Sequence, residues 1–251
     1  AIQNDGQFAG TVENDIGSIT TSSEKEKVIA IIDTGVDYTH EDLVNVMWKN
    51  PFDEETLPGI YGYDFVNKDN DPMDDNGHGT HCAGIIAAEA NNGIGISGAI
   101  VGATNVKIMA LKVGNENGFM LLNDIISAYE YISKAQKLGV NIVAINNSWG
   151  TTWQLGTDKD KTYEELKDVF GQIVRQSGEK GAISVFSAGN DGLNLDENGI
   201  YYGALYNYMA FPVCLENEYE ITVAATDSND KLAYFSNYGD VVDIAAPGVD
   251  I

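Results

Sequence analysis

The segment DDNGHGTHCAG (residues 74–84) holds two of the three histidines of the chain, His78 and His81, among glycines. Histidine titrates near neutral pH and binds metals, so the pair predicts a metal site, a catalytic base or, as a structural alternative, only the start of a helix. The helical zinc motif spaces its histidines four apart around a glutamate. Here they are three apart around glycine and threonine, which makes zinc the weakest of these interpretations.

The elements that must position His78 follow from the hydrophobic pattern. Short apolar runs between turn residues predict buried strands at 28–32, 106–113, 141–146, 182–188, 221–225 and 241–246. Helical periodicity predicts helices at 78–90, 121–138 and 161–178. Strands that alternate with helices are typical of the α/β class, with a mainly parallel central sheet and helices on both faces. No linker divides the chain, so we expect one domain over 1–251, with residues 1–27 as an N-terminal arm.

Polar residues directly follow two of the predicted strands. Asp33 follows 28–32, and Asn190 follows 182–188. Ligands of open parallel sheets bind beyond the carboxyl ends of the strands, so both residues are expected to meet His78 there. In an acyl-transfer site an aspartate orients the histidine, the histidine acts as general base, and an amide donates to the oxyanion. Taken singly, each residue also has a structural interpretation: Asp33 as a turn residue or helix cap, Asn190 as a turn residue and His78 as a helix start. Their combination favours a catalytic role.

Charge and composition exclude other classes of protein. The chain has 14 Lys and Arg against 38 Asp and Glu, a net charge of −24, which excludes the basic surface that nucleic-acid binding needs and fits a protein that binds cations. No apolar run approaches the roughly 20 residues of a membrane helix. Any signal peptide or pro-segment is expected to be removed or not to exist. The two cysteines, Cys82 and Cys214, are expected to be free thiols rather than one disulfide.

Five segments, in order, resemble the motifs of the subtilisin-like serine proteases. They are the Asp motif (28–43), the His motif (76–88), the substrate-binding strand INNSWG (145–150), the oxyanion motif SAGNDG (187–192) and the run before the catalytic serine (221–251). The resemblance implies a three-layer α/β fold in which Asp33 is the orienting acid, His78 the base and Asn190 the oxyanion donor. His81 is then structural.

The nucleophile is the one departure from this family. In the family, the nucleophilic serine lies in a Gly-Thr-Ser-Met-Ala type of motif beyond the Ala-Pro-Gly segment. The sequence of this chain stops at Ile251, before such a motif. We therefore expect a serine endopeptidase whose serine lies on a missing segment, a companion chain or a C-terminal fragment. A catalytically inactive homologue that binds peptides or inhibitors is the alternative. The expected partners are a peptide or protein substrate and a pro-domain inhibitor.

Calcium is the cofactor that the resemblance implies, at one or two structural sites. The loop 63–75 alternates side-chain oxygens of the kind calcium prefers, although an acidic loop can also be merely solvated. It resembles a calcium loop of some family members, with ligands Asp64, Asn67, Asp69, Asp71 and the carbonyl of Met73. The second site resembles the family's high-affinity one, with ligands Asp42, Asn92, the carbonyls of Ala90, Ile94 and Ile96, and Gln3.

Substrate binding is also implied by the resemblance. An extended peptide is expected to pair with Ser148, Trp149 and Gly150, in the manner of an added strand. The pocket for the residue before the scissile bond is expected between Ser187–Gly189 and the stretch 209–212, where Ala210 leaves room for aromatic or large aliphatic side chains. The alternative is a preference for basic peptides, which the strong negative charge would attract. Pro212 matches a family proline that follows a cis bond. Most members of this family are secreted, so the resemblance implies an extracellular location, with an intracellular location as the alternative.

Overall fold

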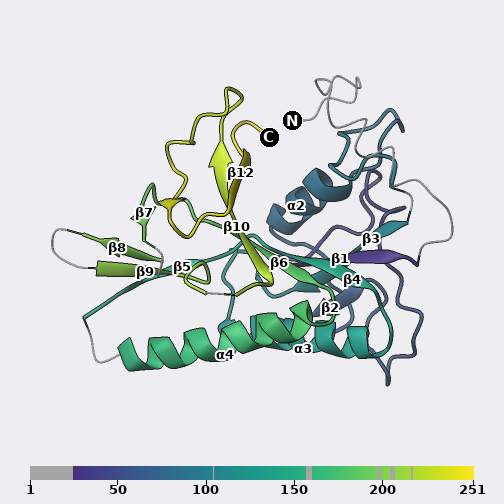
Figure 1. The fold of residues 1–251 in the computed structure, drawn as a ribbon. Helices are drawn as coiled ribbons and strands as arrows, with labels where there is room; N and C mark the ends of the chain where they lie inside the picture. The colour runs from purple at the N-terminus through teal and green to yellow at the C-terminus, as the bar shows by residue number, and fades with distance from the viewer. Residues whose placement is uncertain (1–24, 104, 157–159, 197–198, 204–206, 216) are drawn as a thin grey trace. The chain divides into compact units, whose positions relative to one another are not determined.

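The computed structural model describes residues 25–103, 105–156, 160–196, 199–203, 207–215 and 217–251. The chain forms two compact units, residues 1–145 and 146–251. Within each, strands carry helices packed against their faces (Figure 1). The expectation of one domain over 1–251, with an arm over 1–27, stays a prediction. No helix in the described ranges is both long and apolar enough to cross a membrane.

The first unit is built on parallel strands in the order β4-β1-β3-β2. Strand β1 (Lys27–Asp33) runs parallel to β3 (Val106–Lys112), with Asp33 opposite Lys112 at their carboxyl ends. Both strands are apolar on both faces, because helices cover both, which is why they read as continuous hydrophobic runs. Strand β4 (Ile142–Asn147) lies beside β1, and its last two residues begin the second unit.

Strand β2 (Gly62–Asp64) was not expected from the sequence. It pairs in parallel with β3, with Gly62 opposite Ala110. It spans three residues inside an acidic, turn-rich segment, which is too short for any hydrophobic period to appear.

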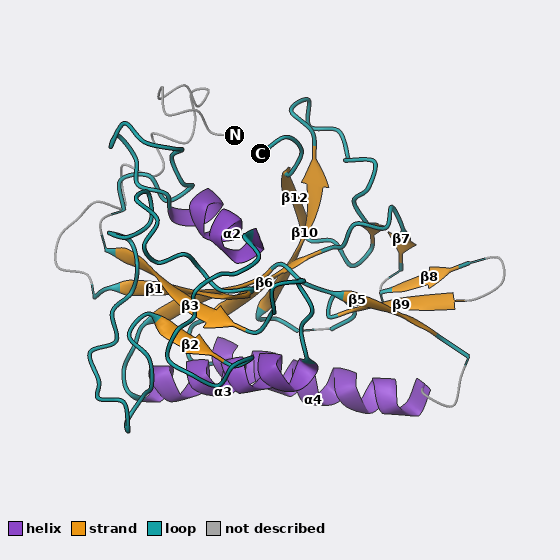
Figure 2. Ribbon diagram, turned by 180° about the vertical axis from the view of Figure 1, so that it is seen from behind, coloured by secondary structure: helices purple, strands orange, loops and turns teal. Residues whose placement is uncertain are grey.

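Helices α2 (His78–Ala87) and α3 (Leu122–Lys137) cover opposite faces of the first unit's strands (Figure 2). Helix α3 has the expected apolar stripe, with Ile125, Ala128, Tyr129, Ile132 and Ala135 buried. It begins with an acidic residue in its first turn and ends with two lysines in its last, which suits the helix dipole. Helix α2 is short and buries Ala83 and Ala87 in a core with Ile31 and Ile108.

The second unit contains three parallel strands in the order β12-β10-β6. These are β6 (Ile183–Ser187), β10 (Glu220–Thr226) and β12 (Ile244–Pro247). Helix α4 (Asp160–Gly178) packs against β6. The strand expected over 241–246 begins only at Ile244, because Val242 N–H donates to Gly239 O in a turn.

Small strands that the sequence did not predict complete the second unit. Strand β5 (Thr151–Gln154) pairs antiparallel with β9 (Asn207–Phe211), which pairs with β8 (Ile200–Tyr202). Strands β7 (Asn194–Leu195) and β11 (Tyr238–Gly239) form a second short pair. The strands of both small sheets have at most five residues, so pairing with distant partners rather than local pattern defines them.

Candidate active site

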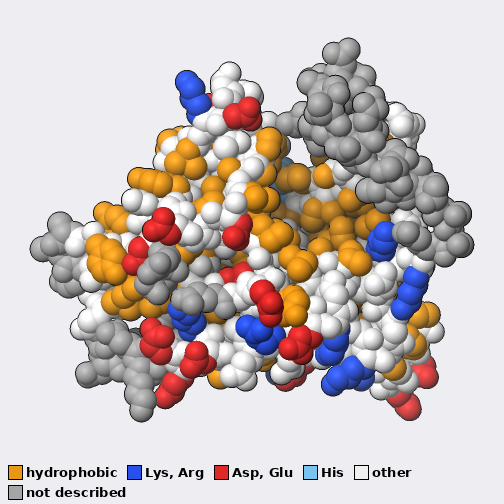
Figure 3. Space-filling view, in the orientation of Figure 1, with side chains coloured by type: hydrophobic (Ala, Val, Ile, Leu, Met, Phe, Trp, Pro, Cys, Tyr) orange, Lys and Arg blue, Asp and Glu red, His pale blue; other side chains and the backbone are white. Residues whose placement is uncertain are grey.

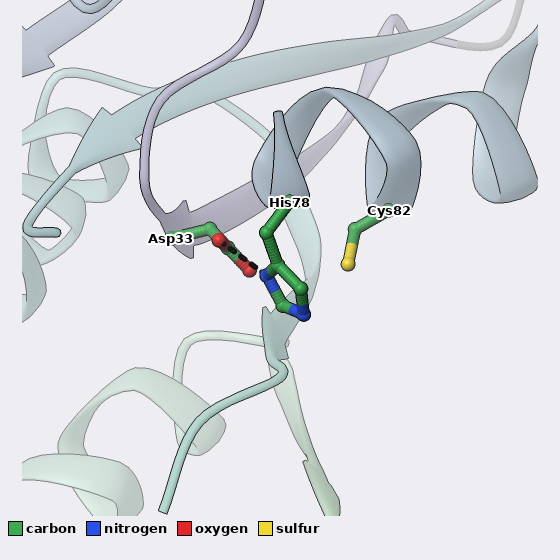
Figure 4. Close-up of side chains that lie close together, drawn as sticks. All are labelled: Asp33, His78 and Cys82. Atoms are coloured by element: carbon green, nitrogen blue, oxygen red, sulfur yellow. Dashed lines mark hydrogen bonds and ion pairs between the residues drawn. The ribbon is translucent and has the colours of Figure 1, made fainter. Parts of the chain in front are cut away.

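An aspartate and a histidine meet at the carboxyl end of β1. Asp33 is the last residue of β1 and its side chain is fully buried, whereas His78 is the first residue of α2 and its side chain is 48% exposed. His78 Nδ1 lies 2.7 Å from Asp33 Oδ1 (Figure 4). The ring's other nitrogen, Nε2, points away from the carboxylate and is the one left to exchange a proton with a reacting group.

The Asp33 carboxylate favours the protonated form of the imidazole. The pKa of His78 is raised above 6.5, first by the hydrogen bond to Asp33, against the opposing effect of burial, and further by the charges of Asp33 and Asp74. Asp33 Oδ1 also accepts the N–H of Thr34 at 2.7 Å. Asp33 Oδ2 is buried with no hydrogen-bond partner in the described part of the chain. A carboxylate fixed in this way orients the ring and stabilises an imidazolium when one forms.

Two glycines allow α2 to start where it does. Gly77, the N-cap residue, has φ 104°, a left-handed conformation that a side chain disfavours. Gly79 lies so close to the turn after β1 that a Cβ would stand 2.1 Å from Gly35 O. The glycine-rich sequence around His78 is therefore what lets the helix approach Asp33.

Cys82 follows His78 by one helical turn and lies beside its ring (Figure 4). Ligand atoms of Asp33, His78 and Cys82 lie within 4.8 Å of one another, the one such group of three among the described residues. Neither Cys82 nor Cys214 takes part in a disulfide, as expected. His81, which was expected to be structural, is exposed on α2.

Sequence reasoning missed three polar residues, Lys112, Asp74 and Asp75, that bond near this pair. Lys112 is buried at the end of β3, and its Nζ donates to Thr34 O at 2.7 Å and Gly114 O at 2.9 Å and pairs with Asp75 Oδ1 at 2.5 Å. Asp74 contacts both Thr34 and the first turn of α2. The available signal was the pair of acidic residues just before the Asn-Gly-His sequence.

The predicted oxyanion residue lies in the second unit, in the turn after β6. Asn190 is exposed there, next to Gly189, whose φ is 101°. Asn237, which sequence reasoning also missed, holds this turn: its Nδ2 donates to Ala188 O at 2.9 Å, and its Oδ1 accepts the N–H groups of Asp191 and Leu193. The turn is thus fixed by a buried amide.

The predicted substrate-binding residues lie in the same unit. Ser148 to Gly150 connect β4 to β5 without strand pairing of their own. Trp149 packs edge-on against Phe170 and Phe186. Ala210 is buried on β9, opposite Thr152 of β5, and Ser187 is exposed at the end of β6. The bond before Pro212 is cis, as expected.

One of the two predicted calcium ligand sets gathers in the structure. Asp42 is 3% exposed; its Oδ1 accepts Asn92 Nδ2 at 2.7 Å and its Oδ2 accepts the N–H of Ile96 at 3.1 Å. The loop 90–96 wraps so closely that a Cβ on Gly95 would stand 2.3 Å from Asp42 Oδ2. Gln3 lies outside the described residues, and carbonyl ligation by Ala90, Ile94 and Ile96 stays a prediction.

The other predicted ligand set, in the loop 63–75, is more spread out. Asp64 Oδ1 accepts two loop N–H groups and its Oδ2 accepts Asn67 Nδ2. Asp71 Oδ1 accepts Tyr38 OH at 2.8 Å and the N–H of Met73. The carboxylates of Asp64, Asp69 and Asp71 do not form a group within 4.8 Å of one another in the described chain. A site here stays a prediction.

Parallel strands flanked by helices, with an Asp–His pair at a strand's carboxyl end, define a protein of the α/β class with an acid–base pair at the edge where such sheets bind ligands. Residues 24–250 match the family model described as the subtilase family, and the chain belongs to this family. It is 38% identical over 231 residues to the thermophilic serine proteinase of Bacillus sp. (strain AK1), covering 92% of this chain and 46% of that protein. It is 33% identical over 220 residues to thermitase of Thermoactinomyces vulgaris, covering 88% of this chain and 62% of that protein.

Solved structures confirm the expected α/β fold class. A lanthipeptide protease superposes with a TM-score of 0.63 at 23% identity, covering 88% of this chain and 55% of that one. A cold-adapted subtilisin-like serine proteinase superposes with a TM-score of 0.59 at 24% identity, covering 92% of this chain and 67% of that one. The chain spans about half to three fifths of the length of the two relatives named above.

Proposed function

We propose that residues 1–251 supply the acid, the base and the oxyanion donor of a serine endopeptidase, whose nucleophilic serine comes from a segment outside this sequence. The observation that carries the proposal is the 2.7 Å contact between His78 Nδ1 and buried Asp33 Oδ1. Membership of the subtilase family supports the same chemistry. The names of two relatives, a thermophilic serine proteinase and a minor extracellular protease, support proteolysis, the latter outside the cell.

The chemistry follows from the two ring nitrogens of His78. Nδ1 is held by Asp33, so Nε2 accepts the serine proton while the serine oxygen bonds to the scissile carbonyl carbon. The amide of Asn190 donates to the oxyanion that forms. The C–N bond then breaks, His78 returns its proton to the leaving amine, and a water molecule cleaves the acyl-enzyme by the same steps. An extended peptide paired with Ser148–Gly150 is the proposed substrate.

Labelling with a serine-directed fluorophosphonate tests this proposal on the full-length protein. We expect one serine outside residues 1–251 to be labelled rapidly, and heat-denatured protein to be labelled at no serine. Peptide mapping by mass spectrometry identifies the modified residue. Native protein that hydrolyses no peptide and takes up no label, yet binds peptides, would show the inactive homologue instead.

We also propose that calcium binds at Asp42 and stabilises the fold. The hydrogen bonds described for the Asp42 carboxylate come from neutral groups, Asn92 Nδ2 and Ile96 N–H, although the side chain is buried. A buried carboxylate with neutral partners favours a bound cation, and calcium prefers such oxygen ligands. Asp42 and Asn92 would hold the ion by side-chain oxygens, the Asn92 amide turning its oxygen inward. Calcium would supply charge compensation and cross-link the loop.

Calcium removal is expected to destabilise the protein. Calcium at a hundredfold excess over its Kd adds about 2.7 kcal/mol to the free energy of unfolding, and a chelator removes this. Differential scanning calorimetry with and without calcium measures the effect. Asp42→Asn is expected to abolish the calcium-dependent rise in Tm. Asp227→Asn, which alters a carboxylate that caps a surface turn at Asn229 and Lys231, is expected to keep it. An unchanged rise in Asp42→Asn would contradict the site.

A further inference from the structure

The first turn of α2 is capped by side chains that come from outside the helix. His78 N–H donates to Asn76 Oδ1 at 3.2 Å, Gly79 N–H to Thr34 Oγ1 at 3.0 Å, and Thr80 N–H to Asp74 Oδ2 at 2.9 Å. The first N–H groups of a helix have no partner within the helix, so each of these three is satisfied by a side chain. Gly77, at the N-cap position, has no side chain with which to do this.

Asp74 is the centre of this cap. Its Oδ1 accepts Thr34 Oγ1 and Gly77 N–H, both at 2.9 Å, and its Oδ2 also accepts Thr80 Oγ1 at 2.6 Å. The Thr34 hydroxyl donates to Asp74 and accepts from Gly79, so it joins the turn after β1 to the helix. A negative charge at this end of a helix is further stabilised by the helix dipole.

We infer that Asp74 is a positioning residue for the catalytic pair: through Thr34 and Thr80 its carboxylate fixes the start of α2 against the end of β1, and so holds His78 against Asp33. Thr34 N–H donates to the same Asp33 oxygen that His78 contacts. The turn after β1 and the start of α2 are thus joined at Thr34 and Gly79, the residues that directly follow Asp33 and His78. A displacement of about 1 Å in such a contact can cost a hundredfold in rate.

Electrostatics support the same role. The hydrogen bond to Asp33 raises the pKa of His78 against the effect of burial, and the negative charges of Asp33 and Asp74 raise it further. Asp74 therefore acts on the imidazole both through geometry and through charge.

Asp74→Asn is the first test. Both oxygens of the Asp74 carboxylate accept hydrogen bonds, one from Thr34 and the other from the N–H and hydroxyl of Thr80. In asparagine one of these two ends is an NH₂ donor, so the contacts with either Thr34 or Thr80 are lost. We expect a lower His78 pKa, a weaker Nδ1–Oδ1 hydrogen bond, and kcat/KM reduced about ten- to hundredfold. Histidine-selective ¹⁵N NMR titration of the full-length protein measures the first two. Asp53→Asn, which removes a carboxylate that caps a separate turn at Thr56, is the matched control and is expected to change none of them.

A second pair of variants decides the matter if Asp74→Asn does not fold. Thr80→Val removes, at nearly constant volume, the hydroxyl that donates to Asp74 Oδ2 and accepts the N–H of Asp37, and Thr80→Ser keeps both contacts. We expect Thr80→Val to weaken the Nδ1–Oδ1 bond and Thr80→Ser to restore it. A His78 pKa and Nδ1 proton signal unchanged in Asp74→Asn, or in Thr80→Val, would overturn the inference. These readouts need no substrate; the inference takes from the proposed function only the role of His78, so loss of proteolysis for another reason leaves them intact.

Discussion

His78→Ala is expected to lower kcat/KM of the full-length enzyme by about 10⁴- to 10⁶-fold, the largest effect of any change in this chain. The reason is that Nε2 of His78 is the proposed acceptor of the serine proton and donor to the leaving amine, and no other histidine approaches Asp33 in the described residues. Cleavage of a chromogenic peptide measures the rate. His81→Ala is the matched control, since it changes an exposed histidine on the same helix and is expected to leave the rate within a few-fold.

The stability of the same variant gives an independent check. The folded pKa of His78 is raised, so the contact with Asp33 contributes to the free energy of unfolding fully below the unfolded pKa of 6.5 and is lost as pH rises through the folded pKa. Denaturant unfolding should therefore separate His78→Ala from the parent most at acidic pH. A difference that grows with rising pH, or a rate lowered by less than tenfold, would contradict the assignment of His78.

Asp33→Asn is expected to lower kcat by about 10⁴-fold while leaving the fold in place. The amide nitrogen can donate to Nδ1, which puts the ring proton on Nε2, the atom that must accept one from serine. The remaining activity is expected to have a different pH dependence. Loss of the Asp33 hydrogen bond and charge lowers the His78 pKa, so the acidic limb of the kcat/KM profile moves to lower pH.

Rate profiles of the parent and of Asp33→Asn between pH 4 and 9 measure both effects. Asp75→Asn is an informative comparison, because this carboxylate pairs with Lys112 rather than with the imidazole. It is expected to lower the rate far less and to leave the acidic limb near its original position. An acidic limb that does not move in Asp33→Asn would show that another group sets the charge of the base.

The sequence by itself determined the main strands and helices, because their signals are local. The runs at 28–32 and 106–113 became β1 and β3, and the periodic segment 121–138 became α3 within one residue at each end. The motif order also selected Asp33 and His78, since a residue's place just after a buried strand or at a helix start is visible in the chain. The glycines at 77 and 79 could be read from the sequence, but the sequence did not predict the left-handed conformation of Gly77 or the close approach of Gly79 to Gly35.

Only the tertiary structure decided which polar groups meet. Asp74 and Thr34 are 40 residues apart and Asn92 and Asp42 are 50 apart, so no local period connects them. The acidic residues at 64, 69 and 71 look alike in sequence, yet they accept from different groups: the N–H of Val66, the N–H of Asp71 and, from outside the loop, the hydroxyl of Tyr38. Side-chain hydrogen bonds depend on angstrom-level approach, and here that approach is set by backbone packing such as Gly79 against Gly35 O.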